Sequence, residues 1–357
     1  MLCLGIESSC DDFAMALVRD EGIIAENIAS QSNIHAVFGG VVPELASREH
    51  LRSVPSLFDE LIDQAGVVPQ DIDLVAVTRG PGLLGSLLVG LGFAKGLVLS
   101  IGSEFIGVNH LIAHLLAPGL DEDLEFPALG LLISGGHTQI YLMDSGYEYR
   151  LLGRTLDDAV GEAFDKTAKL LNLPYPGGQY INALALMAEA DPELFPLPYL
   201  DNQNLNFSFS GLKAAVARYI QKNPHFSLQE FAFEPDVEKI AANRPEIARI
   251  CASFNSCVAL TLYRKVARAL KGCPQVRSLI VAGGVAANSI IRDMMSKLSS
   301  DFSVRLTLPK QSLCMDNGSM VAYSGMLYAK AGYFHHLGVE AVPRGKVIPW
   351  DYCQRSP

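Results

Sequence analysis

Short runs in which apolar residues alternate with polar or small residues open the chain. Three such runs cover residues 2–8, 14–19 and 23–29, and the polar turn Ser8-Ser9-Cys10-Asp11-Asp12 joins the first two. Alternation of this kind is typical of strands. We therefore expect three consecutive strands, with a polar turn after the first.

Helical and strand patterns then alternate along the chain. A long amphipathic stretch runs from Pro43 to about Gly66, and a buried strand is expected at 73–78. A glycine-rich helix is expected after Pro81-Gly82, followed by a short strand at 105–108. Strands that alternate with helices indicate a layered α/β sheet.

The opening pattern returns after a break that is marked by Asp121-Glu122-Asp123 and Pro127. The architecture of residues 2–19 is repeated by a strand at 128–134, a turn at 135–138 and a return strand at 139–143, although the amino acids differ. We therefore predict an α/β fold of two related lobes with duplicated mixed sheets. The first lobe is expected at 1–124, completed by a C-terminal helix at about 321–345, the second at 125–320, and a tail at 346–357.

Glycines follow the expected strands of the second half. Residues 277–282 form a strand that ends in Gly283-Gly284 and enters a helix at about Ala286, and a strand at 303–306 and a helix at 316–330 come later. Segment 222–245, rich in Pro, Asn, Phe and Glu, is expected to be an irregular excursion with helical pieces. The pattern assigns this segment no role.

One stretch, from Leu83 to Gly102, is apolar enough to suggest a membrane span. It contains Lys95 in its interior and glycines at five positions. We interpret it as a buried, tightly packed helix of a soluble protein, and we expect no membrane partner. The first residues alternate like a strand and do not resemble a secretion signal.

Composition restricts the classes of function. Hydrophobic residues make up 49% and charged residues 18% of the 357 residues, so the chain should fold compactly. The formal charge of −10 argues against binding a nucleic acid through the whole surface, so a polyanion must meet a local basic patch or a partner. The seven cysteines are odd in number, scattered and never spaced as CxxC, which argues against both a disulfide framework and a thiolate zinc site and favours a reducing cytoplasm.

Three glycine pairs follow expected strands or loops and suit the approach of a phosphate to backbone N–H groups. Each is also compatible with an ordinary tight turn. Neither a P-loop nor a well-placed dinucleotide motif is present. The three pairs together favour a nucleotide site formed by Ser134-Gly135-Gly136, Pro176-Gly177-Gly178 and Ala282-Gly283-Gly284.

His110 and His114 are four residues apart, so both imidazoles leave one face of a helix. This spacing suits a metal, and it also suits two histidines that only form hydrogen bonds. The zinc-protease helix needs a glutamate after the first histidine, where Leu111 stands, so peptide hydrolysis is disfavoured. Asp316 is a candidate third ligand or the cap of the helix that begins there.

For several other charged residues, the sequence is compatible with either a functional or a purely structural role. Asp11 and Asp12 could orient a nucleophile or only form the turn. Asp165 and Lys166 begin the charged edge of an otherwise apolar helix, which is more typical of a solvated face than of a site. Arg264, Arg268 and Lys271 form a basic stripe that could meet phosphates or simply face solvent.

Taken together, these motifs resemble one family, the bacterial tRNA N6-adenosine threonylcarbamoyltransferases of the TsaD type. The resemblance spans residues 1 to about 345 and depends on many motifs in the same order and spacing. These motifs lie at 5–12, 39–48, 80–83, 110–114, 134–139, 161–166, 176–178, 207–213, 282–288 and 316–318.

The resemblance implies a two-lobed fold of the actin, sugar-kinase and Hsp70 type (ASKHA), with the ligand in a cleft between the lobes. It also implies one divalent metal per subunit, iron or alternatively zinc, held by His110, His114 and Asp316. The positions that match the family's substrate contacts are Leu132, Ile133, Ser134, Gly135, Gly136, Asp165, Gly178 and Asn288.

The implied reaction moves a threonylcarbamoyl group from threonylcarbamoyl-AMP to the exocyclic amine of the adenosine beside the anticodon. The acceptors are tRNAs that read codons beginning with A, and AMP is released. Asp11 and Asp12 are the expected catalytic carboxylates, because one of them could position the amine or accept its proton. Besides tRNA, the implied partners are a paralogous scaffold subunit and a small ATPase subunit.

Three positions depart from the patterns of the wider family. Phe13 stands where a small polar residue is usual, which affects the expected shape of the Asp11-Asp12 turn. Leu132 and Asn182 stand where archaeal and eukaryotic relatives often carry a tyrosine and an acidic residue, and both favour the bacterial branch.

Two rival functions stay open at this stage. One is a carbamoyltransferase that acts on a small-molecule hydroxyl or amine. The other is a non-catalytic scaffold paralogue, although a scaffold has no need to keep His110, His114 and Asp316 together. The family was formerly described as glycoproteases, but Leu111 stands where a zinc protease needs a glutamate and so disfavours that activity.

Overall fold

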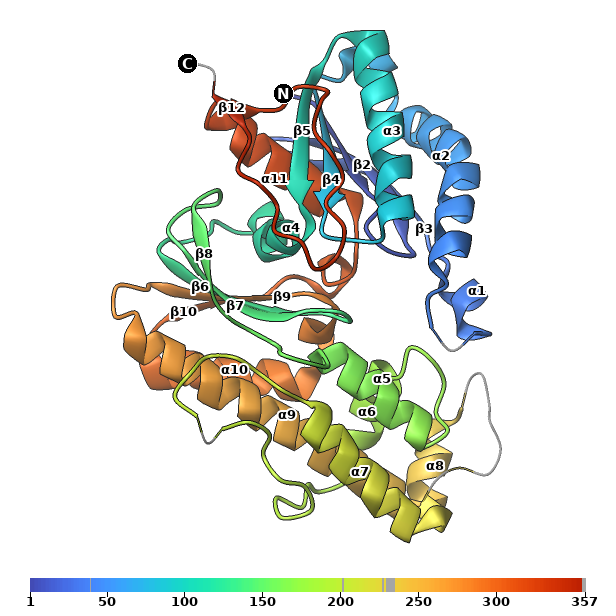
Figure 1. Cartoon of the computed structure of the whole chain (residues 1–357), viewed down its shortest axis with the longest axis vertical. Coiled ribbons are helices and arrows are strands. Elements are labelled where there is room, and N and C mark those ends of the chain that lie inside the picture. Colours follow the sequence, from blue (N-terminus) through green and yellow to red (C-terminus); the bar gives the residue numbers. More distant parts are fainter. Residues whose placement is uncertain (39, 201, 227, 229–234, 355–357) are drawn as a thin grey trace. The chain divides into compact units, whose positions relative to one another are not determined.

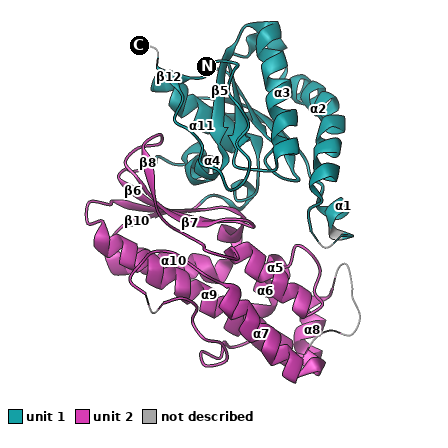
Figure 2. Cartoon of the chain, viewed as in Figure 1, with its two compact units in different colours: residues 1–124, 309–357 teal, residues 125–308 magenta. Residues whose placement is uncertain are grey.

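The computed structural model describes residues 1–38, 40–200, 202–226, 228 and 235–354. The chain forms two compact units, which Figure 2 shows in different colours. Unit 1 comprises Met1–Leu124 and Pro309–Pro357, and unit 2 comprises Glu125–Leu308. The chain therefore leaves unit 2 at Leu308, not at the expected residue 320, because the residues that follow pack on unit 1.

Unit 1 contains one five-stranded mixed sheet within the described residues, in the order β3-β2-β1-β4-β5 (Figure 1). β1, β2 and β3 pair antiparallel, while β4 and β5 continue the sheet in parallel to β1. The three expected opening strands are therefore confirmed. The strands are β1 (Cys3–Glu7), β2 (Phe13–Arg19), β3 (Gly22–Ala29), β4 (Leu74–Gly80) and β5 (Glu104–Asn109).

Alternation along the strands explains how helices cover both faces of this sheet. Leu4 and Ile6 of β1 join the apolar core with α2 and α3, whereas Gly5 of the same strand meets α11. The helices of unit 1 are α1 (Ser32–Ala36), α2 (Pro43–Ala65), α3 (Leu84–Ile101), α4 (His110–Leu116) and α11 (Gly318–Lys330), with short 3₁₀ turns at Pro69–Asp71, Ala117–Leu120 and Gln311–Leu313.

The sheet of unit 2 repeats that of unit 1 strand for strand. Its order is β10-β9-β6-β7-β8, with β6, β7 and β8 antiparallel and β9 and β10 parallel to β6. The predicted duplication of a mixed sheet is therefore confirmed. The strands are β6 (Ala128–Ile133), β7 (Thr138–Met143), β8 (Tyr149–Arg154), β9 (Ser278–Ala282) and β10 (Arg305–Thr307).

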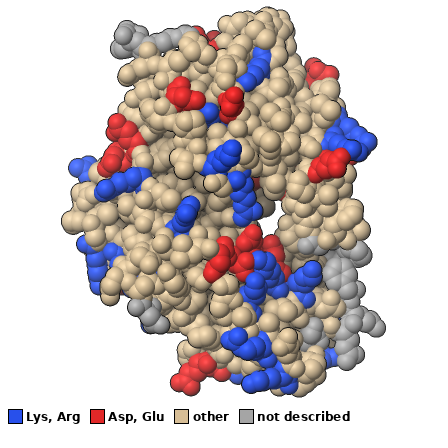
Figure 3. Space-filling view, in the orientation of Figure 1, with Lys and Arg blue, Asp and Glu red and all other residues tan. Residues whose placement is uncertain are grey.

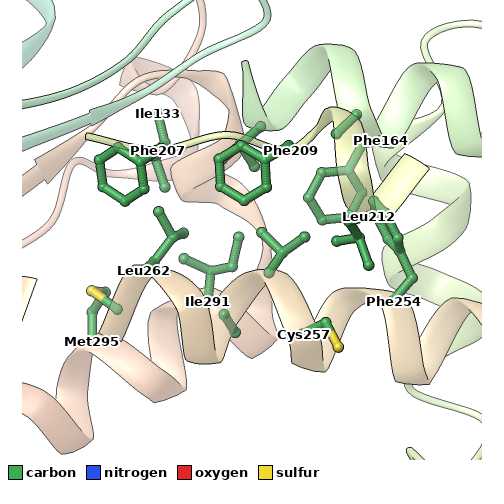
Figure 4. Packing of buried hydrophobic residues seen from close by; sticks show 14 of the residues in the cluster. Ile133, Phe164, Phe207, Phe209, Leu212, Phe254, Cys257, Leu262, Ile291 and Met295 are labelled. Atoms are coloured by element: carbon green, nitrogen blue, oxygen red, sulfur yellow. The ribbon is translucent and has the colours of Figure 1, made fainter. Parts of the chain in front are cut away.

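The helices of unit 2 enclose its larger apolar core, where aromatic rings meet the long helix α9 (Figure 4). Phe207 and Phe209 stack with their ring centroids 6.1 Å apart, and Phe164 meets Phe254 edge-on. The helices are α5 (Val160–Leu170), α6 (Gly178–Ala185), α7 (Ser210–Lys222), α8 (Val237–Asn243), α9 (Pro245–Gly272) and α10 (Ser289–Phe302), with 3₁₀ turns at Pro224–Phe226 and Gly284–Ala287.

The excursion expected at 222–245 contains helical pieces, as predicted. A 3₁₀ turn at Pro224–Phe226 and helix α8 flank residues 227 and 229–234, which lie outside the described residues. Helix α8 packs against α6 and α9, so this segment adds to the helical layer of unit 2.

Helix α3 is the one helix of the described residues that is long and apolar enough to cross a membrane by length and composition. One of its faces packs on β4 and α2, as a core helix does, and the Lys95 ammonium donates to the Val339 carbonyl oxygen at 2.6 Å. Leu88 and Leu99 on the other face are exposed. The helix expected to be buried is therefore buried on one face and exposed on the other.

The C-terminal segment is bound to the sheet of unit 1, where we expected a separate tail at 346–357. The two-residue strands β11 (Tyr333–Phe334) and β12 (Cys353–Gln354) pair antiparallel. Arg79 of β4, whose side chain is 2% exposed, donates to both carboxylate oxygens of Asp351 at 2.5 and 3.2 Å. His335 lies beside this pair, and burial lowers its pKa to about 4. The neutral imidazole accepts from the Gly107 N–H and can donate to Asp351.

The Arg79–Asp351 pair predicts an effect on stability. Asp351→Ala leaves a buried guanidinium without its carboxylate, so we expect the free energy of unfolding to fall by about 1–3 kcal/mol. Urea denaturation measures this difference. Glu340→Ala, at an exposed acid on the same segment, is the control and should change nothing; equal losses in both variants would contradict the account.

Candidate metal centre and glycine loops

Two histidines from α4 form the centre of the candidate site in unit 1. The helix begins directly after β5, and the Asn109 side chain caps it by accepting from the Leu111 N–H at 3.0 Å. His110 and His114 therefore leave the same helical face, with ring centroids 4.7 Å apart. Both side chains are buried. The predicted helical spacing is confirmed.

Asp316 supplies a third group from a distant part of the chain. Its Oδ1 atom lies 2.9 Å from His114 Nε2 and 3.8 Å from His110 Nε2. The sequence left open whether Asp316 caps α11, but the cap is Asn317, whose side chain accepts from the Met320 N–H at 2.7 Å. The carboxylate of Asp316 is therefore directed to the histidines instead.

These three groups fit a metal ion. One ligand atom from each of His110, His114 and Asp316 lies within 4.8 Å of the others. Two imidazole nitrogens and one carboxylate oxygen suit iron or zinc, and three protein ligands leave further coordination positions for a substrate. No other group of three such side chains is found among the described residues.

A close approach between the backbones of β1 and α11 places Asp316 beside the two histidines. A Cβ atom added at Gly5 of β1 would lie 2.1 Å from the Gly318 carbonyl oxygen. One added at Gly318 would lie 2.5 Å from the Ala16 nitrogen. Only glycines permit α11 to begin this close to β1 and β2, so the position of the third ligand depends on them.

Glu7 is a site residue that the sequence analysis missed. It is the last residue of β1 and fully buried, and its Oε2 atom lies 3.0 Å from His110 Nδ1. Burial raises the pKa of this carboxyl group, but His110 outweighs burial and leaves the pKa below its usual range. Burial likewise lowers the pKa of His110, whereas Glu7 and Asp316 raise it to about 9. The sequence did contain one signal that could have identified Glu7 as a site residue: it is a glutamate at the end of an otherwise apolar strand.

The predicted carboxylates Asp11 and Asp12 lie in the turn between β1 and β2. Asp12 Oδ1 is buried without a hydrogen-bond partner among the described residues, and burial raises the pKa of this group to about 6. Phe13, the departure from the family pattern, begins β2 with its ring 5.1 Å from the His50 ring. Its side chain joins the core, so it stabilises the end of the turn instead of entering it.

The predicted residues of unit 2 gather at one end of its sheet. Leu132 and Ile133 end β6, and because their side chains are buried, only their backbone can meet a ligand. The next residues pack under α5: the Gly161 N–H donates to the Ser134 carbonyl at 3.3 Å, and the Glu162 N–H donates to the Gly135 carbonyl at 3.1 Å.

Two further glycine loops adjoin the first one. A Cβ atom at Gly283 would lie 2.6 Å from the Ile133 carbonyl oxygen, so the loop after β9 touches the end of β6. The carboxylate of Asp165 on α5 accepts from the Gly177 N–H at 2.7 Å, and burial raises its pKa to about 6. The three predicted glycine pairs are thus brought together through α5 and β6.

Asn288 and Gly178 mark the starts of two neighbouring helices. Asn288 caps α10, and its side-chain oxygen accepts from the Ile291 N–H at 3.1 Å. Asn182 of α6, the helix that begins at Gly178, lies 3.2 Å from the Ser289 hydroxyl. The predicted residues therefore form two groups, one in unit 1 and one in unit 2.

The basic stripe on α9 has in part a structural role. Lys265 is buried beside the stripe and donates to Asn202 Oδ1 at 2.9 Å and to the Asn204 carbonyl at 3.0 Å. Arg268 donates to the Asn202 and Asn204 carbonyl oxygens. Arg264 and Lys271 remain exposed.

Comparison with known proteins identifies relatives along the whole chain. The family model described as "TsaD: tRNA N6-adenosine threonylcarbamoyltransferase" matches residues 22–323. The protein of that name from Maridesulfovibrio salexigens is 57% identical over 352 residues, which cover 99% of each chain. The one from Geotalea uraniireducens is 45% identical over 346 residues, or 96% of each chain.

Solved structures share the fold at low sequence identity. Full-length HypF in its phosphate- and nucleotide-bound form has a TM-score of 0.57 and 13% identity, covering 92% of this chain and 46% of HypF. Component A of (R)-2-hydroxyglutaryl-CoA dehydratase from Acidaminococcus fermentans has a TM-score of 0.50 and 13% identity, covering 92% and 99%. The fold is thus of the actin, sugar-kinase and Hsp70 type.

The glycine contact between β1 and α11 predicts a test of how the third ligand is placed. Gly5→Ala forces the backbone of α11 away, so we expect a loss of about 1–3 kcal/mol in unfolding free energy and weaker binding of zinc. Gly92→Ala on α3 is the matched control, since its Cβ would meet nothing within 4 Å. Urea denaturation and zinc titration should leave this control unchanged or slightly stabilised; equal behaviour of the two variants would refute the packing account.

Proposed function

The chain belongs to the TsaD family of tRNA N6-adenosine threonylcarbamoyltransferases, and we propose that it transfers the threonylcarbamoyl group of threonylcarbamoyl-AMP to the N6 amine of an adenosine in tRNA. The acceptor is the adenosine beside the anticodon in tRNAs that read codons beginning with A, and AMP is released. The observation that carries this proposal is the 57% sequence identity to a protein of this family over nearly the full chain, together with the cluster of His110, His114 and Asp316.

The proposed cofactor is one divalent metal per subunit, iron with zinc as the alternative. His110, His114 and Asp316 would hold it, and their two nitrogens and one oxygen fit either ion. When bound, such an ion supplies a Lewis acid that polarises the carbonyl group of the substrate. The neighbouring Glu7 carboxylate keeps His110 directed to this place.

The acyl adenylate determines what the protein's own residues must do. The N6 nitrogen attacks the carbonyl carbon, the bond from that carbon to the phosphate oxygen breaks, and AMP leaves with the bonding electron pair. No covalent nucleophile is required, because the substrate is already activated. Burial raises the pKa of the Cys10 thiol, so the cysteine of the first turn is poorly suited to be a nucleophile.

One carboxylate of the first turn would accept the proton that the amine loses. Asp12 suits this role better than an ordinary aspartate, because burial raises its pKa to about 6 and its Oδ1 atom has no partner among the described residues. Asp11 would hold the amine in place beside it. The carboxylate is ionised at neutral pH and therefore able to take a proton.

The glycine loops of unit 2 would hold the AMP part of the substrate. The loop Ser134-Gly135-Gly136 lies against the first turn of α5, whose Gly161 and Glu162 N–H groups donate to the Ser134 and Gly135 carbonyl oxygens. A phosphate would approach the backbone of the two glycines, which have no side chain in the way. Asp165 accepts from Gly177 and keeps the second glycine loop in place. Asn288 and Gly178 begin the two helices beside these loops.

The charge of the chain is divided unequally between the units. Residues 125–308 contain 18 Lys and Arg and 18 Asp and Glu, whereas the rest of the chain contains 10 and 20. Unit 2 is thus neutral and unit 1 carries the entire charge of −10. Figure 3 shows lysines and arginines, with a group of acidic residues beside them, on the side of unit 2 that carries α5 and α7. Repulsion of phosphates favours contacts of tRNA with unit 2.

Partner subunits would supply the remaining basic surface. We propose a paralogous scaffold subunit and a small ATPase subunit as these partners, and the acidic unit 1 is the surface that a basic partner would complement. The seven cysteines are free thiols, which agrees with a proposed location in the reducing cytoplasm.

The metal ligands give the first test of this function. His110→Ala and Asp316→Ala should each lower formation of the modified nucleoside by about 100-fold or more while the chain stays folded, because the carbonyl loses its electrostatic activation. The assay combines purified chain, the proposed partners, threonylcarbamoyl-AMP and unmodified tRNA, with nucleoside mass spectrometry as readout. His336→Ala, at an exposed histidine of unit 1, is the control.

Other outcomes of this assay would overturn the proposal. Normal turnover by either ligand variant would reject the metal-assisted scheme. An absence of product from the wild-type chain, with a metal bound, would favour a carbamoyltransferase for small molecules or a non-catalytic scaffold.

A second prediction concerns the isolated chain and salt. The affinity of the chain for a labelled anticodon stem-loop should be weak and should fall roughly tenfold or more between about 50 and about 200 mM salt, as expected for about three phosphate contacts. Fluorescence anisotropy measures this affinity. Tight binding that resists salt would contradict the idea that partners complete the tRNA surface.

A further inference from the structure

We infer that Glu7 is the positioning residue of the metal site, because its carboxylate fixes the ring of His110 with Nε2 directed towards Asp316. The inference rests on the proposed function for the metal itself, but it concerns a residue that lies behind the ligands. Glu7 would touch neither substrate nor metal, and it would act only through His110.

The carboxylate of Glu7 is fully engaged by three donors. Oε1 accepts from the Ser9 N–H at 2.6 Å. Oε2 accepts from the Thr78 hydroxyl at 2.5 Å and lies 3.0 Å from His110 Nδ1. These donors come from the first turn, from β4 and from α4, so the carboxylate connects three elements that surround the site.

A buried carboxylate at position 7 lowers the stability of the fold unless other groups compensate its charge. A carboxylate with no exposed surface loses its hydration, and burial of an unpaired charge is strongly unfavourable. The other residues of β1 are Cys3, Leu4, Gly5 and Ile6, which need no polar partner. An apolar residue at position 7 would satisfy the packing of the strand, so packing does not explain a glutamate there.

The geometry selects one tautomer of His110. In the neutral ring that binds a metal, an Nδ1–H that donates to Glu7 leaves the lone pair of Nε2 free, and Nε2 is the nitrogen 3.8 Å from Asp316 Oδ1. A carboxylate behind a metal-bound histidine orients the ring and increases its ability to donate electrons. Ser9 Oγ lies 3.3 Å from Nδ1 and 3.4 Å from Nε2, farther than Glu7 from Nδ1.

The second histidine has no such support. His114 is 1% exposed, and its Nδ1 atom is buried without a hydrogen-bond partner among the described residues. The two ligands of α4 are therefore held unequally. A change at Glu7 should affect His110 alone, which separates this inference from a general loosening of the site.

The test is the metal affinity of Glu7→Gln, which needs no tRNA. Glutamine keeps the shape of the side chain, but it has no charge and its amide group cannot accept from all three donors. We expect zinc and cobalt to bind about 10–100-fold more weakly to the metal-free variant, measured by competition with a chelator. Glu340→Gln, at an exposed position of the same unit, should bind both metals like the wild type.

A second variant and a direct measurement guard against loss of folding. Thr78→Val removes one donor to Glu7 without touching His110, so it should weaken zinc binding by a smaller factor than Glu7→Gln. Circular dichroism and thermal unfolding check that each variant is folded. In the wild-type protein with zinc bound, two-dimensional ¹⁵N NMR of the histidine rings should show His110 protonated at Nδ1.

The results separate this inference from the proposed function. Equal zinc affinity of wild type and folded Glu7→Gln, or a His110 ring protonated at Nε2, would overturn the inference even if the wild-type chain modifies tRNA. Weaker zinc binding by Glu7→Gln and Nδ1 protonation would support it even if no tRNA product forms, in which case only the proposed function fails.

Discussion

The close contact between β1 and the start of α11 is the constraint on which unit 1 depends. No side chain fits between Gly5 and Gly318, so the two backbones meet directly. Along the chain, Gly5 and Gly318 are separated by the whole of unit 2. The contact therefore holds the start of α11 on the sheet of unit 1 and also places Asp316 beside His114. The same packing thus determines both the fold of unit 1 and the geometry of the candidate metal site.

The two units share a sheet but differ in chemistry. The strand order is the same in both, so the architecture of one is repeated in the other. Unit 1 has the metal-site candidates His110, His114 and Asp316 and all of the net charge, while unit 2 has no net charge and contains the glycine loops. Under the proposed function, the negative charge of unit 1 would suit a cation, and the uncharged backbone amides of unit 2 would suit a phosphate.

Local patterns predicted most of the elements well. Alternation located the opening strands and their repetition, and the spacing of His110 and His114 indicated a shared face. What they did not show was the orientation of the rings. Glu7 went unnoticed because a single buried carboxylate gives no periodic signal, and its meaning depends on Thr78 and His110, which lie far from it in the chain.

The sequence by itself determined the fold class, the duplication and the family, because these depend on local periodicity and on motifs in a fixed order. Tertiary structure alone decided that Asn317, and not Asp316, caps α11, that the chain returns to unit 1 at Pro309, and that Asp351 neutralises the buried Arg79. Each of these depends on contacts between segments that are distant in the chain. Such contacts arise from packing and burial, which a pattern of neighbouring residues does not encode.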